Sequence, residues 1–335
     1  MPGRDYHQLF EQFRNLRVMV IGDVMVDAYL FGRVERISPE APVPVVTVEK
    51  RVNRLGGAAN VALNLKAMGA EPLLCSVIGN DVKGKEFIQL LVEGQITGKA
   101  IITSGNRITT TKFRVIGNKA QMLRVDEEMT TDLDQKDEAV LLEKIFDVLN
   151  HEKPDAIIFQ DYNKGVLTTN LIREVIQKAK SVRVPVSVDP KKKNFLEYKG
   201  VNLFKPNLKE LREGLGLDVN SHDPVSLEVA ALQLHQDQDI ETVMVTLSDE
   251  GVFISHRNED GSIARQVVPA HRRNIADVSG AGDTVISVAT LCMACELDPR
   301  EVAILSNLAG GLVCEEAGVV PVNREKLLKE AVSLI

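Results

Sequence analysis

A glycine-rich segment in the last fifth of the sequence carries the residues best suited to chemistry. It reads Asp277-Val278-Ser279-Gly280-Ala281-Gly282-Asp283-Thr284, and an apolar run follows at once. This pattern predicts a loop that opens a buried helix, whose first N–H groups lack helical partners and attract anions. A bound phosphate would repel Asp283, which makes sense if its carboxylate takes a proton from a hydroxyl that attacks phosphorus. A plain helix start explains the segment equally well, so other residues must decide.

A second glycine pair, Gly56-Gly57, lies far upstream and is followed by Asn60. Glycines let the backbone approach a ligand closely, and an asparagine side chain can both donate and accept hydrogen bonds. A tight strand-to-helix turn is the plainer interpretation. Asp27 comes just after the first predicted strand, where open α/β sheets bind ligands, and its carboxylate could accept from two hydroxyls.

Two further motifs have better structural than functional explanations. Gly79-x4-Gly84-Lys85 resembles a phosphate-binding loop, but Glu86 stands where magnesium binding requires Ser or Thr. We therefore expect a turn and a helix start there. The cysteines of Cys292-x-x-Cys295 lie inside the apolar run after Asp283, with no second pair nearby, so we expect them to pack in the core.

Taken together, the two glycine segments resemble the signatures of the ribokinase-type carbohydrate kinases, the PfkB family. Their order and wide separation match, and Ser279 stands where the family more often has Thr. Shorter blocks resemble the bacterial members that act on D-glycero-D-manno-heptose 7-phosphate. These blocks are residues 22–27, 37–46, 161–165, 189–191 and 206–210, and the resemblance as a whole runs from about residue 17 to 320.

The resemblance implies roles for residues around the reacting groups. Asp283 would be the catalytic base, beside an anion hole formed by the N–H groups of Gly280, Ala281 and Gly282. Asp277 would lie near a monovalent cation, potassium above all. The residues that would hold sugar hydroxyls are Asp27, Gly56, Gly57 and Asn60.

The resemblance also implies a nucleotide site for ATP. Glu210 would contact magnesium through water, since magnesium keeps several of its waters. Asn207 and Glu210 also have the spacing of a helix capping box, and both interpretations can hold at once. The expected nucleotide-binding residues are Asn207, Leu208, Lys209, Glu210, Thr246, Ser248, Gly251 and Asn307.

A phosphate on the substrate would need cations to bind it. The candidates are Arg33, Arg36, Lys112, Arg114, Arg124 and Lys164. Arginine suits phosphate through its planar fork, although any one of these side chains could simply be solvated. We expect Lys112, Arg124 and Lys164 to contact the substrate, together with Asp161, which precedes Lys164 in a tight turn after a strand.

The elements that must position these residues alternate between strand and helix. Strands are expected at 17–21, 73–78, 155–160, 184–189, 203–205 and 243–247, and helices at 57–68, 83–92, 168–180, 300–317 and 325–333. This alternation predicts a mostly parallel sheet with helices on both faces. Strands 107–116 and 121–126 look antiparallel. With segment 26–50, the segment 98–127 would form a small separate sheet, which the resemblance makes a lid and a dimer interface.

Composition limits the class of protein. The 335 residues carry a formal charge of −7, are 44% hydrophobic and contain no stripe of like charge, which argues against nucleic acid as the main partner. No apolar run reaches the roughly 18–20 residues that cross a bilayer, and the polar start lacks the apolar core of a signal peptide. We expect one ribokinase-like domain over 1–335, located in the cytoplasm.

These observations favour an ATP-dependent kinase that phosphorylates the anomeric hydroxyl of the heptose 7-phosphate. The alternatives are another sugar or sugar-phosphate kinase, such as a ribokinase or fructose phosphate kinase, and a non-catalytic sugar- or nucleotide-binding regulator. An intact Asp283 argues against the regulator. A dinucleotide-dependent dehydrogenase is disfavoured, because Gly22-Asp23-Val24 follows the first strand in place of G-x-G-x-x-G. Some heptose-phosphate kinases are fused to a nucleotidyltransferase with an H-x-G-H motif, which does not occur in this sequence.

Overall fold

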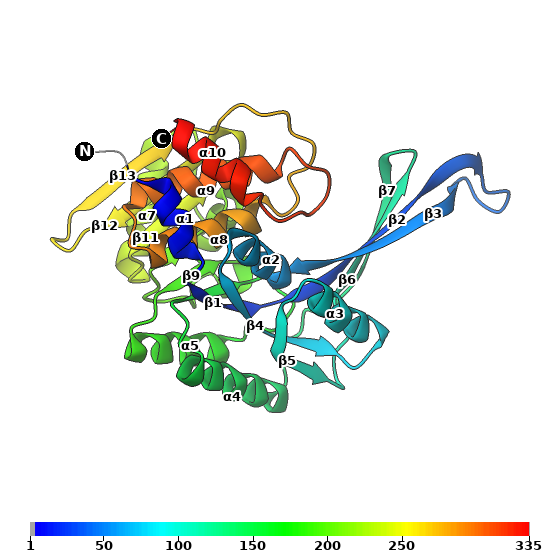
Figure 1. Cartoon of the computed structure of the whole chain (residues 1–335), viewed down its shortest axis with the longest axis horizontal. Coiled ribbons are helices and arrows are strands. Elements are labelled where there is room, and N and C mark those ends of the chain that lie inside the picture. Colours follow the sequence, from blue (N-terminus) through cyan, green and yellow to red (C-terminus); the bar gives the residue numbers. More distant parts are fainter. Residues whose placement is uncertain (1–3, 335) are drawn as a thin grey trace.

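The computed structural model describes residues 4–334, so Met1, Pro2, Gly3 and Ile335 of the expected 1–335 domain lie outside the described range. Within it, the strands form a nine-stranded sheet and a separate four-stranded sheet. Helices cover both faces of the large sheet, and the small sheet projects from the body as a long ribbon (Figure 1). No helix in this range is long and apolar enough to cross a membrane.

The large sheet has the order β13-β12-β11-β10-β9-β8-β1-β4-β5. Its first seven strands in chain order pair in parallel, and the hairpin of β12 and β13 adds an antiparallel edge. The strands are β1 (Arg17–Gly22), β4 (Glu71–Gly79), β5 (Thr97–Ser104), β8 (Ala156–Gln160), β9 (Val186–Asp189), β10 (Leu203–Phe204), β11 (Thr242–Thr246), β12 (Val252–Arg257) and β13 (Ile263–Val268).

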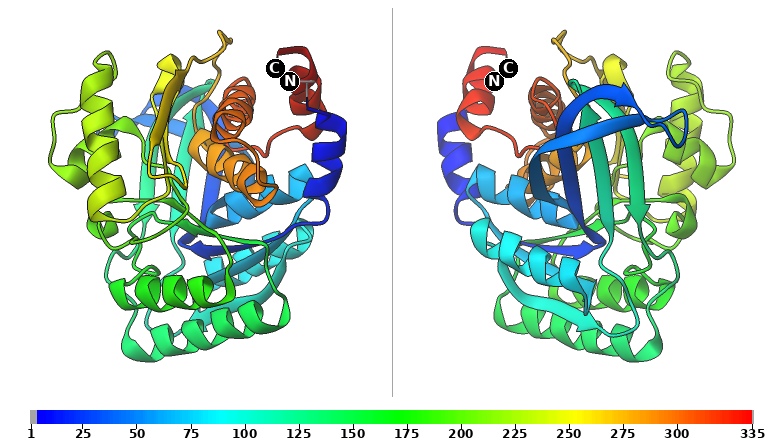
Figure 2. Two further views of the ribbon diagram at one scale, coloured as in Figure 1. Left: turned by 90° about the vertical axis from the view of Figure 1, so that its left-hand side faces the viewer. Right: turned by 90° about the vertical axis from the view of Figure 1, so that its right-hand side faces the viewer.

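Successive side chains along the large sheet point to opposite faces and pack into two separate hydrophobic cores. Val18 and Val20 of β1 pack on one face, and Met19 and Ile21 pack on the other, as the two-residue period of a strand requires. The first face is covered by α1 (Tyr6–Phe13), α2 (Ala58–Met68), α3 (Val82–Glu93), α8 (Ala281–Ala294), α9 (Pro299–Val313) and α10 (Arg324–Leu334). The second is covered by α4 (Gln135–His151), α5 (Thr169–Val182), α6 (Leu208–Leu215) and α7 (Pro224–Asp237). Two views from the sides show these layers (Figure 2).

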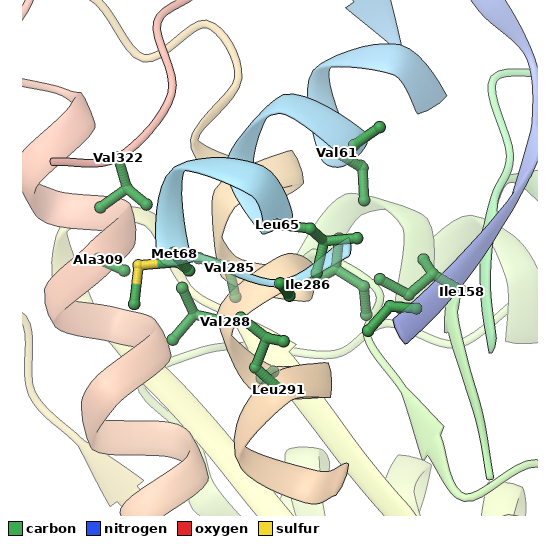
Figure 3. Close-up of a cluster of buried hydrophobic side chains, with 14 of the residues drawn as sticks. Val61, Leu65, Met68, Ile158, Val285, Ile286, Val288, Leu291, Ala309 and Val322 are labelled. Carbon is green, nitrogen blue, oxygen red and sulfur yellow. The ribbon is translucent and has the colours of Figure 1, made fainter. Parts of the chain in front are cut away.

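The helix that carries Asp283 is anchored through its apolar side chains. Every residue of α8 from Asp283 to Cys292 is buried. Figure 3 shows α8 packed against α2, with Ile158 of β8 beside them. The α8 side chains in this cluster are Val285, Ile286, Val288 and Leu291, and those of α2 are Val61, Leu65 and Met68. Cys292 belongs to the same core, and Cys295 packs against it half-buried, as expected.

The small sheet has the order β3-β2-β6-β7. It contains β2 (Val24–Ile37), β3 (Pro44–Gly57), β6 (Thr111–Gly117) and β7 (Ala120–Glu127). β3 begins at Pro44 and is an edge strand, the position in a sheet where a proline is tolerated. The expected lid segment 98–127 begins too early, because β5 pairs in parallel with β4 and belongs to the large sheet.

Residues 107–110 were expected in a strand, but β6 begins only at Thr111. Their polar groups are engaged elsewhere: Asp81 accepts the N–H of Thr109 at 2.7 Å, and Arg107 donates to the carbonyl of Thr131 at 2.9 Å. Asp81 also accepts the N–H of Gly84 at 2.6 Å and so caps α3. The loop between β4 and α3 is therefore the turn and helix start expected from Glu86.

Candidate active site

The start of α8 is shaped by Gly280. This residue has φ +83°, a left-handed conformation that favours glycine. A Cβ atom at this position would also lie 3.0 Å from the side-chain nitrogen of Asn60. Asp283 follows in the first turn of the helix with only 4% of its surface exposed. The predicted loop and buried helix are confirmed.

Three side chains donate hydrogen bonds to the Asp283 carboxylate. Asn60 Nδ2 reaches Oδ2 at 2.7 Å, whereas Tyr162 Oη and Gln160 Nε2 reach Oδ1 at 2.7 and 3.1 Å. Burial raises the pKa of Asp283 to about 6, although the hydrogen bonds from Asn60 and Tyr162 lower it. Burial and the adjacent Asp283 raise the pKa of Tyr162 well above its usual value, so its hydroxyl remains a donor. A carboxyl that titrates near neutrality suits a general base.

A buried polar network connects Asp283 to the neighbouring strands. Gln160 Nε2 also donates to Asp189 Oδ2 at 3.2 Å, and Lys205 Nζ lies 3.0 Å from the same oxygen. Lys205 is 2% exposed, so its charge is compensated inside the protein. Asp189 Oδ1 has no hydrogen-bond partner among residues 4–334. Sequence reasoning assigned no role to these three residues, although each stands at or just after the carboxyl end of a parallel strand.

A cavity of about 200 Å³ opens in front of this network. It lies at the carboxyl ends of the parallel strands, where open α/β sheets bind ligands. Its lining combines carboxylates, two lysines and the glycines of the α8 start. The lining residues are Tyr162, Asp189, Lys191, Lys205, Asn207, Glu210, Thr246, Gly280, Gly282 and Asp283.

Asn207 and Glu210 form the capping box expected from their spacing. The N–H of Glu210 donates to Asn207 Oδ1, and the N–H of Asn207 donates to Glu210 Oε2, both at 2.8 Å. Lys191 donates to the other oxygen of Glu210. Burial lowers the pKa of Lys191, but Asp189 and Glu210 outweigh it and the pKa is raised. Glu210 caps α6 and its side chain also lines the cavity, so the cap is compatible with the expected contact to magnesium through water.

Of the other expected nucleotide-binding residues, Thr246 lines the cavity, whereas Leu208, Lys209, Ser248, Gly251 and Asn307 lie outside this lining. Lys209 points outward with 79% of its side chain exposed and pairs with Glu213 at 3.8 Å. Leu208 packs against the second core. Ser248 and Gly251 form the turn after β11, with φ +60° and +107°. Asn307 donates to the carbonyl of Pro269 at 3.0 Å and so ties α9 to the loop before α8.

The expected sugar site lies where the small sheet meets the body. Asp27 is buried and forms an ion pair with Arg114 of β6. A Cβ atom on Gly56 would overlap Asp27 Oδ2, so glycine is needed for this packing. Gly57 has φ +60° immediately before α2. Asp27, Gly56 and Gly57 are thus brought together, and Arg114 is a partner of Asp27.

Three of the expected phosphate-binding cations gather beside the cavity. Lys112 Nζ lies 5.6 Å from the ring centroid of Tyr162. Burial lowers the pKa of Lys112, and the positive charges of Lys164 and Arg124 lower it further. Lys164 pairs with Glu128 at 2.8 Å and Arg124 with Asp126 at 2.9 Å. The three cations come from β6, β7 and the loop after β8, and two of them, Arg124 and Lys164, are each paired with a carboxylate.

Asp161 does not reach this site, contrary to expectation. Its carboxylate is buried beneath the loop after β8 and accepts from the N–H of Asn163 and the hydroxyl of Tyr198, both at 2.8 Å. Burial and the nearby Asp23 raise the pKa of Asp161 to about 6. Asp23, between β1 and β2, holds the same loop by accepting the N–H groups of Tyr162, Lys164 and Val166 at 2.8, 3.0 and 3.0 Å.

Asp277 shapes the loop before α8. It accepts the N–H of Ser279 at 2.9 Å and the N–H of Gly318 at 3.1 Å. Burial raises the pKa of Asp277, but these N–H groups outweigh it and the net shift is downward. The carboxylate is therefore ionised and joins the glycine loop to the turn after α9.

A second cavity, of about 250 Å³, lies between β12, β13 and the start of α9. It contains none of the expected site residues. Arg265, in its lining, is neutralised by Glu228 at 3.1 Å. We place the candidate active site at the smaller cavity, because the buried carboxylate, the lysines and the N-terminus of α8 converge there.

The chain belongs to the pfkB family of carbohydrate kinases, whose model matches residues 15–326. It is 39% identical over 327 residues to the bifunctional protein HldE of Syntrophotalea carbinolica, covering 98% of this chain and 65% of that protein. It is 38% identical to the bifunctional protein HldE of Wolinella succinogenes, covering 90% and 61%. The chain thus spans somewhat less than two thirds of the length of these relatives.

Solved structures show the same ribokinase-like fold. Phosphofructokinase-2 from Escherichia coli, in complex with potassium, superposes with a TM-score of 0.78 at 17% identity, over 95% of this chain and 99% of that one. Ribokinase from Arabidopsis thaliana, in complex with ribose and ATP, gives a TM-score of 0.69 at 18% identity, over 94% and 99%. Family and fold together establish the chain as a sugar kinase.

Proposed function

We propose that this kinase transfers the γ-phosphoryl group of ATP to the anomeric hydroxyl of D-glycero-D-manno-heptose 7-phosphate. The product is the 1,7-bisphosphate, a precursor of ADP-heptose for the lipopolysaccharide core. Support for this substrate comes from the blocks that resemble heptose-phosphate kinases and from the similarity to the HldE proteins. Another sugar or sugar-phosphate kinase of the same family is the alternative.

One observation carries the reaction type: a buried carboxylate of raised pKa stands in the first turn of a helix that opens onto the cavity. In the proposed reaction Asp283 accepts the proton of the anomeric hydroxyl. The oxygen forms a bond to the γ-phosphorus, and the bond from that phosphorus to the bridging oxygen breaks, which releases ADP. The N–H groups of Gly280, Ala281 and Gly282 stabilise the charge on the phosphoryl group in flight.

The residues present fit a magnesium ion bound mostly through water. Glu210 lines the cavity, and the buried Asp189 Oδ1 lacks a hydrogen-bond partner within the described chain. Magnesium supplies positive charge that offsets the phosphates and keeps several waters, so one or two carboxylates are sufficient. For potassium, Asp277 stands beside the glycine loop as the candidate contact.

A negatively charged substrate fits the positive side chains that lie where the small sheet joins the body of the protein. Lys112, Arg124 and Lys164 would bind the 7-phosphate, whereas Asp27 and Asn60 would contact hydroxyl groups. The small sheet would act as a lid that excludes water, the competing phosphoryl acceptor. We also propose that the protein is located in the cytoplasm and that two copies associate through this sheet. The side chains of Met122, Leu123 and Val125 of β7 are exposed and would be available for that contact.

The test is a panel of sugars in an assay of ATP consumption, with the product identified by phosphorus NMR. The heptose 7-phosphate should give the highest kcat/KM, and the new signal should be that of an anomeric phosphate. Fructose 6-phosphate, ribose and the unphosphorylated heptose are the comparison substrates. A higher kcat/KM for any of them would transfer the assignment to that sugar.

A further inference from the structure

The contact between Lys191 and Glu210 places a protein cation where the proposed function needs a metal-bound water. Lys191 follows β9, two residues after Asp189, and donates to Glu210 Oε1. The other oxygen, Oε2, accepts the N–H of Asn207 at 2.8 Å. Both oxygens of Glu210 therefore already accept a hydrogen bond. Each oxygen has a further lone pair, but a hydrated magnesium ion beside Oε1 would be repelled by the ammonium of Lys191 unless the lysine moves away. The N–H belongs to the helix cap and is fixed, whereas the lysine side chain is not.

We propose that Lys191 is a counter-ion that exchanges partners: it neutralises Glu210 when no nucleotide is bound, and it moves to the nucleotide's phosphate oxygens when a magnesium-bound water takes its place. This inference rests on the proposed assignment of magnesium to Glu210. It adds a catalytic role for Lys191, because the displaced ammonium then contacts the group being transferred.

The surroundings of Lys191 point to the phosphates as its second partner. Its Nζ lies 5.6 Å from the ring centroid of Tyr162, whose hydroxyl donates to Asp283 at 2.7 Å. The ammonium is thus already beside the reacting centre. It lines the same cavity as Gly280 and Gly282, whose helix start is the expected phosphate site. A lysine ammonium on a flexible four-carbon stem can change partners by side-chain rotation alone.

The second lysine of the cavity is not free to make this exchange. Lys205 Nζ lies 3.0 Å from Asp189, and the side chain is 2% exposed, whereas that of Lys191 is 28% exposed. Lys205 would leave a buried carboxylate without its counter-ion if it moved, which is costly. Lys191 leaves Glu210 only when another cation arrives there, so its exchange exposes no isolated charge.

The experiment compares Lys191→Met and Lys191→Arg with the control Lys192→Met, which changes the neighbouring exposed lysine. Binding of Mn²⁺ is measured by electron paramagnetic resonance with a non-hydrolysable ATP analogue at saturating concentration and without sugar. Lys191→Met should bind the metal about tenfold more tightly, because no charged hydrogen bond at Glu210 has to be displaced. Its kcat at saturating metal should fall by about 10²-fold, the typical loss of one donor to a transition-state oxyanion. Lys191→Arg should recover part of the turnover.

Opposite changes in metal affinity and in kcat distinguish the exchange from a purely structural ion pair. Unchanged or weaker metal binding in Lys191→Met would overturn the exchange. If Lys191→Met binds the metal more tightly but turns over as fast as Lys192→Met, the contact between Lys191 and phosphate would be overturned. Asp189 Oδ1, which lacks a hydrogen-bond partner within the described residues, would then be the second partner of the lysine. Glu210→Gln in the same measurement isolates the underlying assignment: unaltered metal affinity there rejects Glu210 as the metal contact and this inference with it. The identity of the sugar does not enter the metal measurement.

Discussion

The side-chain amide of Asn60 donates to the carboxylate of Asp283 over 2.7 Å, although 223 residues separate them in the chain. This bond joins the two glycine signatures of the sequence at a single oxygen atom of Asp283, the proposed base. Asn60 Oδ1 is buried and has no hydrogen-bond partner within residues 4–334. Asn60 can therefore hold the base with its nitrogen and accept a substrate hydroxyl with its oxygen.

Replacing Asp283 with Asn should abolish turnover and leave nucleotide binding close to intact. The amide has nearly the size of the carboxyl group but cannot accept the proton. The loss of a general base typically costs about 10²–10⁴-fold in rate. Single-turnover kinetics measures the chemical step, and calorimetry with an ATP analogue measures binding. A variant with the wild-type rate would show that Asp283 is not the base.

The pH dependence of kcat/KM should have an acid limb near pH 6. The pKa of Asp283 is raised to about 6, so the ionised form that can accept a proton is lost as the pH falls through that value. Tyr162→Phe removes a hydrogen bond that favours the ionised form, so the limb should move to higher pH. Tyr198→Phe is the control, because that hydroxyl donates to Asp161. If the acid limb lay at the same pH in Tyr162→Phe and Tyr198→Phe, the hydroxyl of Tyr162 would have no influence on the pKa of the group that controls the rate.

Replacing Glu210 with Gln should increase the magnesium concentration that gives half the maximal rate. The amide keeps much of the capping geometry but loses the negative charge that attracts the hydrated ion. Glu213→Gln, one turn along α6, is the matched control, because within residues 4–334 Glu213 forms an ion pair with the exposed Lys209 alone. A magnesium titration that is the same in all three proteins would mean that Glu210 serves only as a helix cap.

Potassium should stimulate the enzyme. An ion beside Asp277 would stabilise the loop that supplies the anion hole, because Asp277 already fixes this loop through the N–H of Ser279. The measurement compares initial rates in potassium chloride and in tetramethylammonium chloride at equal ionic strength. Equal rates in the two salts would remove the ion from the mechanism.

The enzyme should prefer the heptose 7-phosphate to the free heptose by at least ~10²-fold in kcat/KM. Charge-assisted hydrogen bonds contribute about 1.5–3 kcal/mol each, and two such bonds to a remote phosphate help to position the reacting hydroxyl. Arg124→Ala and Lys164→Ala should each reduce this preference. Lys119→Ala, at the exposed turn between β6 and β7, should not.

Comparable kcat/KM values for the two sugars in the wild type would contradict a phosphorylated substrate and favour a ribokinase-like specificity. A strong preference that survives Arg124→Ala and Lys164→Ala would keep the substrate and place its phosphate elsewhere.

The parts of this protein that could be predicted from sequence are those with local signals. The strand–helix alternation gave the parallel sheet, and the spacing of Asn207 and Glu210 gave the capping box. Lid segment 98–127 was wrong at its start because strands 97–104 and 111–117 look alike locally, and only long-range pairing assigns the first to β4. Such pairing has no signature within one segment.

Asp283 could be singled out as the candidate base because its glycine loop is distinctive, whereas the residues that contact it in the structure could not. Gln160, Asp189 and Lys205 act through contacts between strands that are far apart in sequence, and a lone polar residue after a strand is common. Asp161 was misplaced because the turn from 161 to 164 fixes the direction of the chain but not which side chain faces the cavity. Lys164 faces the other cations, and Asp161 is buried beneath.

The only residue between β1 and β2 is Asp23, and its carboxylate also holds the turn that carries Tyr162. The small sheet therefore joins the large sheet through a single residue at this point, without a flexible linker. This junction lies beside Tyr162, which lines the candidate active site. A tilt of the small sheet would then be transmitted through Asp23 to the backbone of Tyr162, whose hydroxyl donates to Asp283. In the proposed function, closure of the small sheet over the sugar and alignment of Asp283 would therefore be a single motion.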